Sequence, residues 1–471
     1  MTKTGAIDTS IRTLGTPKLT SRLPYRTWVD DVRLPIQVDR ELCDEFTEPV
    51  CLDFEAAGPR KKLYFDPSRA KCAIVTCGGL CPGLNDVIRA IVMEAHHAYH
   101  VPSIMGIRYG LEGFIPACGH QPMELTPERV ADIHRFGGTI LGSSRGPQSA
   151  EEIVDSLERS NVSILFVIGG DGSMKAALSI SREVQARNLK IAVIGIPKTI
   201  DNDLAGTDHC PGFASAAKYI ATSIMEVYCD AHVYDTGMIT IIECMGRHAG
   251  WLTAAAALAG VKGCGPDLIY LPEVDFDLDD FTKKVEDIYN KNKNCIVAVS
   301  EGIHDKDGTF IAEYANKNMA KDSFGHAQLG GLAAFLANHV KQATGAKVRG
   351  IELSLLQRCA AHCASQTDID ESFMSGKAAV ENAVNGVTDK MVGFEREMVD
   401  GKYTCKIKLF DLSIVANTEK KVPRQWINNE GDGITDGFID YALPLIQGQT
   451  KMTVEDGLPR FVHLKKVKAE A

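Results

Sequence analysis

Short apolar runs that alternate with helix-like stretches are the feature that most constrains the fold of this chain. The runs are CAIVT (72–76), SILFVIGG (163–170), IAVIGIP (191–197), ITIIECMG (239–246), DLIYLPE (267–273) and CIVAVSEG (295–302). Amphipathic stretches such as NDVIRAIVMEAHHAY and FASAAKYIATSIMEVY lie between them. Continuous β-branched runs are typical of strands buried on both faces, as in a parallel sheet covered by helices. The alternation therefore predicts an α/β protein with doubly wound, Rossmann-like lobes.

Each predicted strand ends in a polar loop, and most of these loops are rich in glycine. The loops TCGGLCPG, GGDGS, PKTIDND, MGRHAG and SEG follow five of the strands. In open α/β sheets, ligands bind outside the carboxyl ends of the strands. We therefore expect the five loops to converge on one crevice, or on two facing crevices, and to form the active site of an enzyme.

Composition excludes several classes of protein. At 471 residues the chain is long enough for two or three lobes. The net charge of -10 argues against a nucleic-acid partner. No apolar run is long enough to cross a bilayer, and the segment MTKTGAIDTSIRTLG lacks a signal-peptide core, so we expect a cytoplasmic protein without a membrane partner. The 14 scattered cysteines are interpreted as small buried hydrophobic residues, not as a disulfide framework.

The pattern also predicts how the chain is divided. Residues 1–70 form an N-terminal extension, 71–215 a first α/β lobe, 216–365 a second α/β lobe, and 366–471 a C-terminal helix, hairpin and tail that pack back on the body. The hairpin would pair KMVGFEREMV with KYTCKIKLF around Asp400-Gly401, a pair of residues typical of a type I′ turn.

The segment Gly169–Ser173 opens a predicted helix directly after a buried strand. Glycines let a phosphate approach the backbone, and a helix N-terminus offers free N–H groups. Asp171 could hold Mg²⁺ there. The alternative is a tight strand–helix turn in which Asp171 is an N-cap. No Walker A sequence is present, which argues against an ordinary P-loop ATPase.

The segment PKTIDND (197–203) places two carboxylates, Asp201 and Asp203, beside Lys198 and Thr199. At a strand end this arrangement suits a divided task. One carboxylate can accept the proton of an attacking hydroxyl while the other binds Mg²⁺. The alternative is a solvated acidic turn.

Other loop residues have the chemistry to bind anions or sugar hydroxyls. Backbone amides of Gly78 and Gly79 can face an oxyanion, and arginines can bind phosphate oxygens in bidentate fashion. For each of these residues alone a structural role, such as a surface ion pair or a helix cap, is equally in keeping with the pattern. The candidates are Gly78, Gly79, Arg145, Arg247, Glu301, Arg349 and Arg358.

Taken together, these loops resemble those of the phosphofructokinase family. The matching pieces are CGGLCPGLNDVIR (77–89), GGTILGSSRG (137–146), IGGDGS (168–173), PKTIDND (197–203), MGRHAG (245–250), VSEG (299–302) and the pair Arg349/Arg358. They stand in the family's order and cover roughly residues 72–365. The GGDG piece is shared with NAD and diacylglycerol kinases, whereas PKTIDND followed by MGR is much more specific.

The resemblance implies phosphoryl transfer from Mg-ATP to the 1-hydroxyl of fructose 6-phosphate. Asp201 would be the base, Asp171 and Asp203 the Mg²⁺ ligands, and Thr199 and Lys198 would lie near the transferred group. The lobe of residues 71–215 would bind the nucleotide or other phosphoryl donor, and the lobe of residues 216–365 would bind fructose 6-phosphate. The donor phosphates would bind Gly78, Arg145, Gly170, Asp171, Gly172 and Ser173. Arg247 would stabilise the transition state, and the sugar phosphate would bind Met245, Gly246, Arg247, Glu301, Arg349 and Arg358.

Three positions depart from the pattern of the short bacterial members. Leu80 replaces an Asp in the first loop, Leu355 replaces a His of the sugar-phosphate pocket, and Met238 stands near the place of an Arg supplied by a neighbouring subunit. Two phosphate contacts are therefore missing. The N-terminal extension and Lys198 resemble instead the long-chain members of the family.

The phosphoryl donor is predicted from two residues that point in opposite directions. Gly172 leaves space for the adenosine and its α-phosphate, whereas pyrophosphate-dependent members usually carry Asp there. Lys198 is common in pyrophosphate-dependent members. Because long ATP-dependent members combine this Gly with this Lys, ATP is the expected donor and pyrophosphate the alternative.

Other classes of function are weaker explanations of the whole set of motifs. A NAD or lipid kinase would account for GGDGS but not for PKTIDND with MGR. A non-catalytic regulatory paralogue would not need both Asp201 and Asp203. By analogy with the family, we expect a homotetramer or homodimer.

Overall fold

The computed structural model describes residues 9–21, 28–29, 32–38, 50–56, 60–233, 235–315, 331–415 and 418–464. The last seven residues, 465–471, and much of the predicted N-terminal extension lie outside these ranges.

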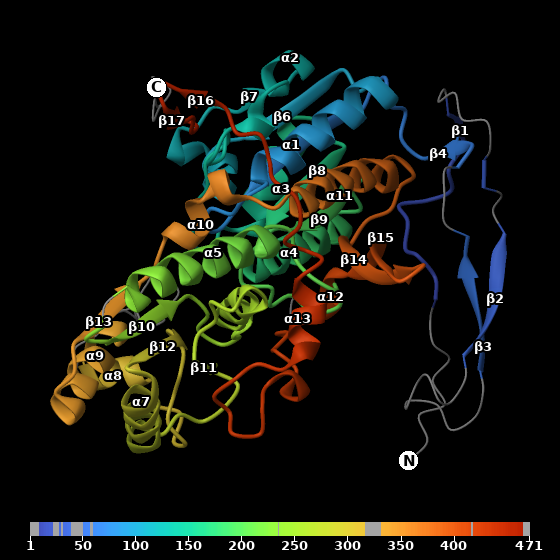
Figure 1. Ribbon diagram of the computed structural model, residues 1–471. Helices are drawn as coiled ribbons and strands as arrows, with labels where there is room; N and C mark the ends of the chain where they lie inside the picture. Colours follow the sequence, from blue (N-terminus) through green and yellow to red (C-terminus); the bar gives the residue numbers. More distant parts are fainter. Residues whose placement is uncertain are drawn as a thin grey trace.

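A seven-stranded, mostly parallel sheet forms the first half of the fold, which lies in the upper part of Figure 1. Its strand order is β15-β14-β9-β8-β5-β6-β7. The strands are β5 (Lys71–Thr76), β6 (Ser103–Ile107), β7 (Met123–Glu124), β8 (Ile164–Gly169), β9 (Ala192–Pro197), β14 (Lys390–Val399) and β15 (Lys402–Asp411). Strands β8 and β9 are buried throughout, as their continuous apolar runs predict.

Helices cover both faces of this sheet. Ile74 and Phe166 pack toward helices α1 (Leu84–Met93) and α11 (Gln366–Val384). Val75 and Val167 pack on the opposite face against α3 (Ala150–Arg159) and α4 (Asp171–Ala186). Successive residues of a strand point to opposite faces, so one apolar run supplies both cores.

A second, four-stranded parallel sheet has the order β11-β12-β10-β13 and lies at the lower left of Figure 1. Its strands are β10 (Met238–Cys244), β11 (Leu268–Tyr270), β12 (Asn294–Ser300) and β13 (Val348–Glu352). Helix α5 (Phe213–His232) packs on one face, and α7 (Leu278–Asn292) and α9 (Leu332–Thr344) pack on the other. The two sheets confirm the predicted α/β class with two mostly parallel sheets.

The C-terminal hairpin is confirmed at the predicted residues. Strands β14 and β15 pair from Lys390↔Asp411 to Val399↔Lys402, and both turn residues are left-handed, with φ of 52° at Asp400 and 72° at Gly401. These angles are those of a type I′ turn. Strand β14 also pairs in parallel with β9, so the hairpin extends the first sheet.

One predicted strand is wrong in extent. The run expected as a strand over 267–273 forms only the three-residue β11, because Pro272 in the following turn has no N–H to donate. The chain after β10 forms a short α6 (Trp251–Ala254) continued by the 3-10 helix η6 (Ala255–Lys262).

The remaining elements are short. The helices are the π-helix η2 (Glu94–Ala98), the 3-10 helices η3 (Gly110–Phe114), η4 (Pro116–Cys118), η5 (Ile133–Arg135), η7 (Ala361–Cys363) and η8 (Arg424–Trp426), and the α-helices α2 (Pro127–Val130), α8 (Ile311–Ala315), α10 (Leu356–Cys359), α12 (Leu412–Val415) and α13 (Asp436–Ala442). The strands are β1 (Leu19–Thr20), β2 (Arg33–Val38), β3 (Val50–Glu55), β4 (Lys62–Leu63), β16 (Val454–Glu455) and β17 (Leu458–Pro459).

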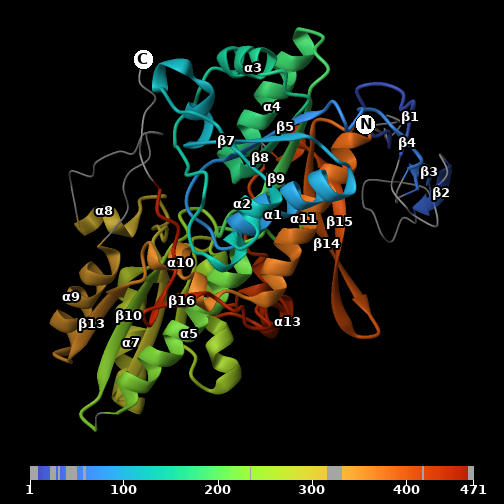
Figure 2. The same ribbon diagram turned by 90° about the horizontal axis from the view of Figure 1, so that it is seen from above.

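The described part of the N-terminal region lies along the body at one edge (Figures 1 and 2). The Leu14 N–H donates to the Gly386 carbonyl at 2.9 Å, and Arg12 forms an ion pair with Asp389. The 13 described cysteines are all free thiols. Within the described ranges, none of the helices combines the length and the apolar character that a membrane span requires.

Candidate active site

The loop that follows β9 carries the two predicted carboxylates. Between them lies Asn202, which is fully buried and left-handed, with φ of 55°. Its Oδ1 accepts the Cys210 N–H at 2.9 Å, and its Nδ2 donates to the Tyr441 hydroxyl at 3.0 Å. A buried side chain with partners on both atoms fixes the turn, and therefore fixes Asp201 and Asp203 on its two sides.

Asp201 is held by a residue of its own loop. The Thr199 hydroxyl donates to Asp201 Oδ2 at 3.3 Å and accepts the Asp201 N–H at 3.1 Å. Burial raises the pKa of Asp201, and the guanidinium groups of Arg358 and Arg145 lower it. The structure thus brings both arginines, from distant parts of the sequence, to the carboxylate predicted to be the base.

Asp203 lies in a more negative environment. Burial raises its pKa to about 7, and the charges of Asp201, Glu419 and Asp171 act in the same direction. Among the described residues its Oδ1 has no hydrogen-bond partner although it is buried. Asp171, at the first turn of α4, binds Lys175 through Oδ2 at 2.6 Å. No group of three potential metal ligands stands close together in the described part of the chain.

A narrow cradle of positive charge lies over the first glycine loop. A Cβ placed on Gly79 would stand 2.9 Å from Arg358 Nη1 and 3.6 Å from Arg145 Nη2. Glycine is therefore needed at this position for both guanidinium groups to approach the loop backbone. Two converging arginines are suited to binding a phosphate group.

The loop after β10 supplies the residues predicted to bind the acceptor. Gly246 is left-handed, with φ of 137°, and its N–H donates to Glu301 Oε1 at 3.3 Å. Burial raises the pKa of Glu301, and the neighbouring charges include those of Asp201, Arg247 and Arg358. Met245 is held through its N–H, which donates to Gln357 Oε1 at 3.3 Å. These residues therefore face Asp201 from the second sheet.

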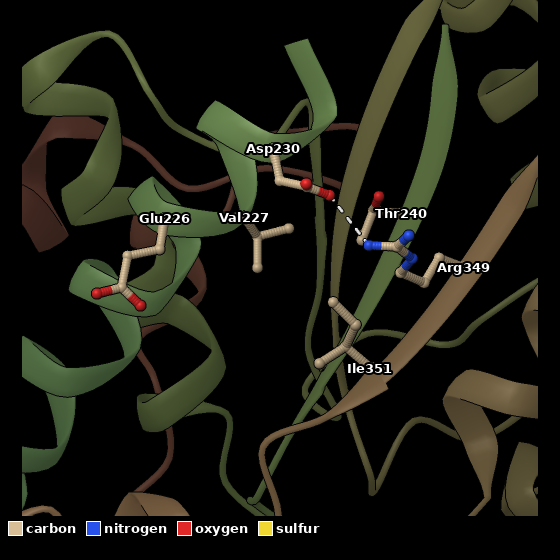
Figure 3. Close-up of a pocket in the computed structure, with 6 residues that line it drawn as sticks. All are labelled: Glu226, Val227, Asp230, Thr240, Arg349 and Ile351. Carbon is tan, nitrogen blue, oxygen red and sulfur yellow. Dashed lines mark hydrogen bonds and ion pairs between the residues drawn. The ribbon is translucent and has the colours of Figure 1, made fainter. Parts of the chain in front are cut away.

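Arg349 is placed elsewhere within the chain. Arg349 pairs in register with Thr240 of β10. Thr240 stands five residues before Met245, and five residues span roughly 17 Å along a strand. Its Nη1 donates to Asp230 Oδ2 at 3.0 Å in a pocket of about 230 Å³ (Figure 3). The pocket is lined by Glu226, Val227, Asp230, Thr240, Arg349 and Ile351.

Lys198 is buried, and its ammonium group faces protein atoms. It donates to Cys81 Sγ at 2.8 Å, to the Pro211 carbonyl at 3.3 Å and to the Pro82 carbonyl. The side chain therefore joins the first glycine loop to the loop after β9. The resemblance to the family instead predicts the Lys198 ammonium near the transferred phosphoryl group.

The donor-side glycines differ in their surroundings. The Gly78 N–H donates to the Ser144 carbonyl at 3.3 Å, and the Ser143 hydroxyl donates to the Gly78 carbonyl at 2.6 Å. A Cβ on Gly170 would touch the Thr199 Cβ at 3.5 Å. A Cβ on Gly172 would have no described atom within 4 Å outside its chain neighbours and the backbone of its own helix. Ser173 is buried at the start of α4.

A buried polar network behind the loop has no counterpart in the sequence predictions. His209 lies between Asp208, at 2.8 Å from Nδ1, and Glu371, at 2.7 Å from Nε2. Arg396 binds Asp208 through two nitrogens at 3.2 Å, and Lys420 reaches the same region from the C-terminal segment. Glu371, Arg396 and Lys420 are far in sequence from the neighbouring Asp208 and His209 and form no motif with them, so no sequence signal could have indicated this network.

Comparisons with known proteins agree with the motifs. The profile of the family described as Phosphofructokinase matches residues 71–361. A pyrophosphate–fructose 6-phosphate 1-phosphotransferase of Xanthomonas campestris pv. campestris is 45% identical over 402 residues, which is 83% of this chain and 95% of that protein. An ATP-dependent 6-phosphofructokinase of Amycolatopsis methanolica is 49% identical over 252 residues, covering 53% of this chain and 54% of that protein.

A solved structure is similar over nearly the same extent. The crystal structure of the pyrophosphate-dependent phosphofructokinase of Marinobacter aquaeolei superposes with a TM-score of 0.74 at 32% identity, covering 85% of this chain and 98% of that one.

Proposed function

The chain belongs to the phosphofructokinase family, and on that premise we propose that it transfers a phosphoryl group from pyrophosphate to the 1-hydroxyl of fructose 6-phosphate. The observation that carries the choice of donor is the extent of similarity. The pyrophosphate-dependent relative aligns over 95% of its length, whereas the ATP-dependent relative aligns over 54%. This reverses the expectation from Gly172, which favours ATP.

The geometry supports a base on one side of the reacting hydroxyl and positive charge around the phosphates. Asp201 would accept the proton of the 1-hydroxyl while Thr199, which holds it, contacts the transferred group. Arg145, with the Gly78 loop, would bind the donor. Arg247, Arg358 and Glu301 would bind the sugar phosphate. Phosphoryl transfer depends mostly on such positioning and charge neutralisation.

The family implies Mg²⁺, and the carboxylates present fit it. Asp203 Oδ1 is buried without a partner among the described residues, and burial together with the surrounding negative charge raises the pKa of this carboxyl. Mg²⁺ prefers oxygen ligands and needs only one or two carboxylates beside substrate phosphates. Asp203 and Asp171 would hold the ion, which when bound neutralises charge on the phosphate oxygens. The protein itself keeps Asp203 oriented, because the backbone carbonyl of Asp203 accepts the Lys420 N–H at 2.7 Å.

ATP is the second candidate donor, because one specific observation favours it. The space beside Gly172 is open: outside its chain neighbours and the backbone of its own helix, no described atom lies within 4 Å of the point that a Cβ would occupy there. An Asp at this position would add a negative charge facing the donor, and its absence leaves room for an α-phosphate.

The position of Arg349 supports a homotetramer or homodimer. Within one chain this arginine lies away from Asp201, and 47% of its side chain is exposed. A neighbouring subunit could take it into its own sugar-phosphate site. Light scattering on the purified protein tests this proposal, and a monomer that is fully active would contradict it.

The donor assay tests the proposed function. Purified protein, Mg²⁺ and fructose 6-phosphate are supplied with pyrophosphate or with ATP, and fructose 1,6-bisphosphate is measured. Turnover with pyrophosphate alone supports the proposal, and turnover with ATP alone replaces it by the second candidate. No turnover with either donor refutes both.

A further inference from the structure

The C-terminal segment Glu419–Val422, which we name the strap, lies against the loop that carries the candidate base. Leu204 and Glu419 form an antiparallel bridge, and the Lys420 N–H donates to the Asp203 carbonyl at 2.7 Å. The Lys420 ammonium donates to Asn202 Oδ1 at 3.3 Å, to the Thr207 carbonyl at 3.1 Å and to the Asp208 carbonyl at 2.8 Å. One side chain thus binds three acceptors of this loop.

The same strap contacts the loop of the second sheet. Trp251 Nε1 donates to the Lys420 carbonyl at 2.8 Å, and the Lys420 Nζ lies 4.9 Å from the centre of the Trp251 ring. The Val422 N–H and the Gly250 N–H both donate to Glu273 Oε1, each at 2.9 Å. Gly250 ends the segment that begins with Met245 and Arg247, so the strap reaches both halves of the site.

We propose that Lys420 is a positioning residue that holds the Asp201 loop in register with the Arg247 loop. The inference rests on the proposed function, in which the two loops bind the two reactants. The residues that bind donor and acceptor come from different sheets, and no hydrogen bond between strands joins those sheets in the described part of the chain. Both sheets pack against one hydrophobic core, and the strap adds hydrogen bonds that fix the distance between the base and the sugar site.

The physical reason is the sensitivity of the chemical step to geometry. Displacing a reacting group by about 1 Å can lower the rate about 100-fold, even when the binding contacts survive. The ammonium is suited to the task because its three N–H groups meet three oxygens that would otherwise lose a donor. Lys420 touches neither reactant in this scheme, so its loss is expected to lower kcat more than it raises KM.

The test uses Lys420→Met, which keeps the length of the side chain and removes its charge and donors. We expect kcat to fall about 100-fold, with the KM of both substrates changed less than about threefold. Amide exchange of residues 198–208 is expected to be about tenfold faster. Lys420→Arg should recover at least about tenfold of the lost kcat, since it restores charged donors. Lys421→Met, which removes the same charge from the neighbouring residue, is the matched control.

The outcomes separate this proposal from the proposed function. A folded Lys420→Met variant with wild-type kcat, or an equal loss in Lys421→Met, overturns the positioning role. If Lys420→Met does not fold, the deciding variant is Trp251→Phe, which removes the donor to the strap carbonyl and part of the ring beside the Lys420 ammonium. An unchanged kcat in Trp251→Phe overturns the proposal. If the wild type uses neither donor, the proposed function fails, and amide exchange of residues 198–208 alone tests the positioning role of Lys420. Unchanged exchange in Lys420→Met then overturns that role.

Discussion

The substitution Gly79→Ala tests the arginine cradle over the first glycine loop. The new Cβ would stand 2.9 Å from Arg358 Nη1, whereas ordinary van der Waals contact begins at 3.4 Å. The guanidinium must therefore withdraw by about 0.5 Å, the difference between these distances. The atom that moves is the end of a flexible side chain, and the φ of Gly79 lies outside the left-handed region, so we expect little change in the thermal midpoint.

The expected effect is on substrate binding. A hydrogen bond to a charged group contributes about 1.5–3 kcal/mol, and a shift of this size should forfeit roughly half of that. A loss of about 1.4 kcal/mol corresponds to a tenfold weaker binding constant. We therefore expect the KM for fructose 6-phosphate to rise about tenfold. Withdrawal of Arg358 also removes the main charge that lowers the pKa of Asp201, so the acid limb of the kcat profile should move to higher pH.

Steady-state kinetics over a range of fructose 6-phosphate concentrations gives both quantities. Gly260→Ala is the matched control, because outside its chain neighbours and its own helix backbone the nearest atom to its Cβ is 4.0 Å away. A KM within twofold of the wild type in Gly79→Ala, with the control also unchanged, would show that Arg358 does not bind the sugar phosphate from its position beside this loop.

Three further substitutions give distinct readouts. Asp201→Asn should lower kcat by about 10²–10⁴-fold with substrate KM largely retained, and near-wild-type turnover would remove Asp201 from the role of base. Gly172→Asp should fit, because outside its chain neighbours and its own helix backbone no described atom lies within 4 Å of a Cβ there, and it should abolish any use of ATP while sparing pyrophosphate in paired donor assays. Burial raises the pKa of Asp86 to about 8, so its contribution favours the folded state below pH 4 and is lost as the pH rises toward 8. Asp86→Asn should therefore raise the thermal midpoint by about 2 °C or more at pH 8 but not at pH 4, and an equal shift at both pH values would contradict this.

Strand positions and loop chemistry were predictable because they depend on local patterns. Each buried strand is a continuous apolar run, and each candidate loop follows such a run, so the carboxyl ends could be located from the sequence. The hairpin at Asp400-Gly401 was predictable because an Asp-Gly pair readily adopts the two consecutive left-handed conformations that a type I′ turn requires. The donor was less predictable, because Gly172 permits a nucleotide without requiring one.

The tertiary structure decided which of these side chains meet. Strand register places Arg349 roughly 17 Å before the β10 loop within its own chain, and the fold turns the Lys198 ammonium toward Cys81 and Pro211. Lys420 reaches the Asp201 loop from more than 200 residues away, in a segment with no motif. By itself, the sequence determined the fold class, the family and the chemical groups available, since period and spacing are properties of neighbouring residues. Contacts between distant segments depend on how the sheets and the strap pack, and only the folded chain sets that geometry.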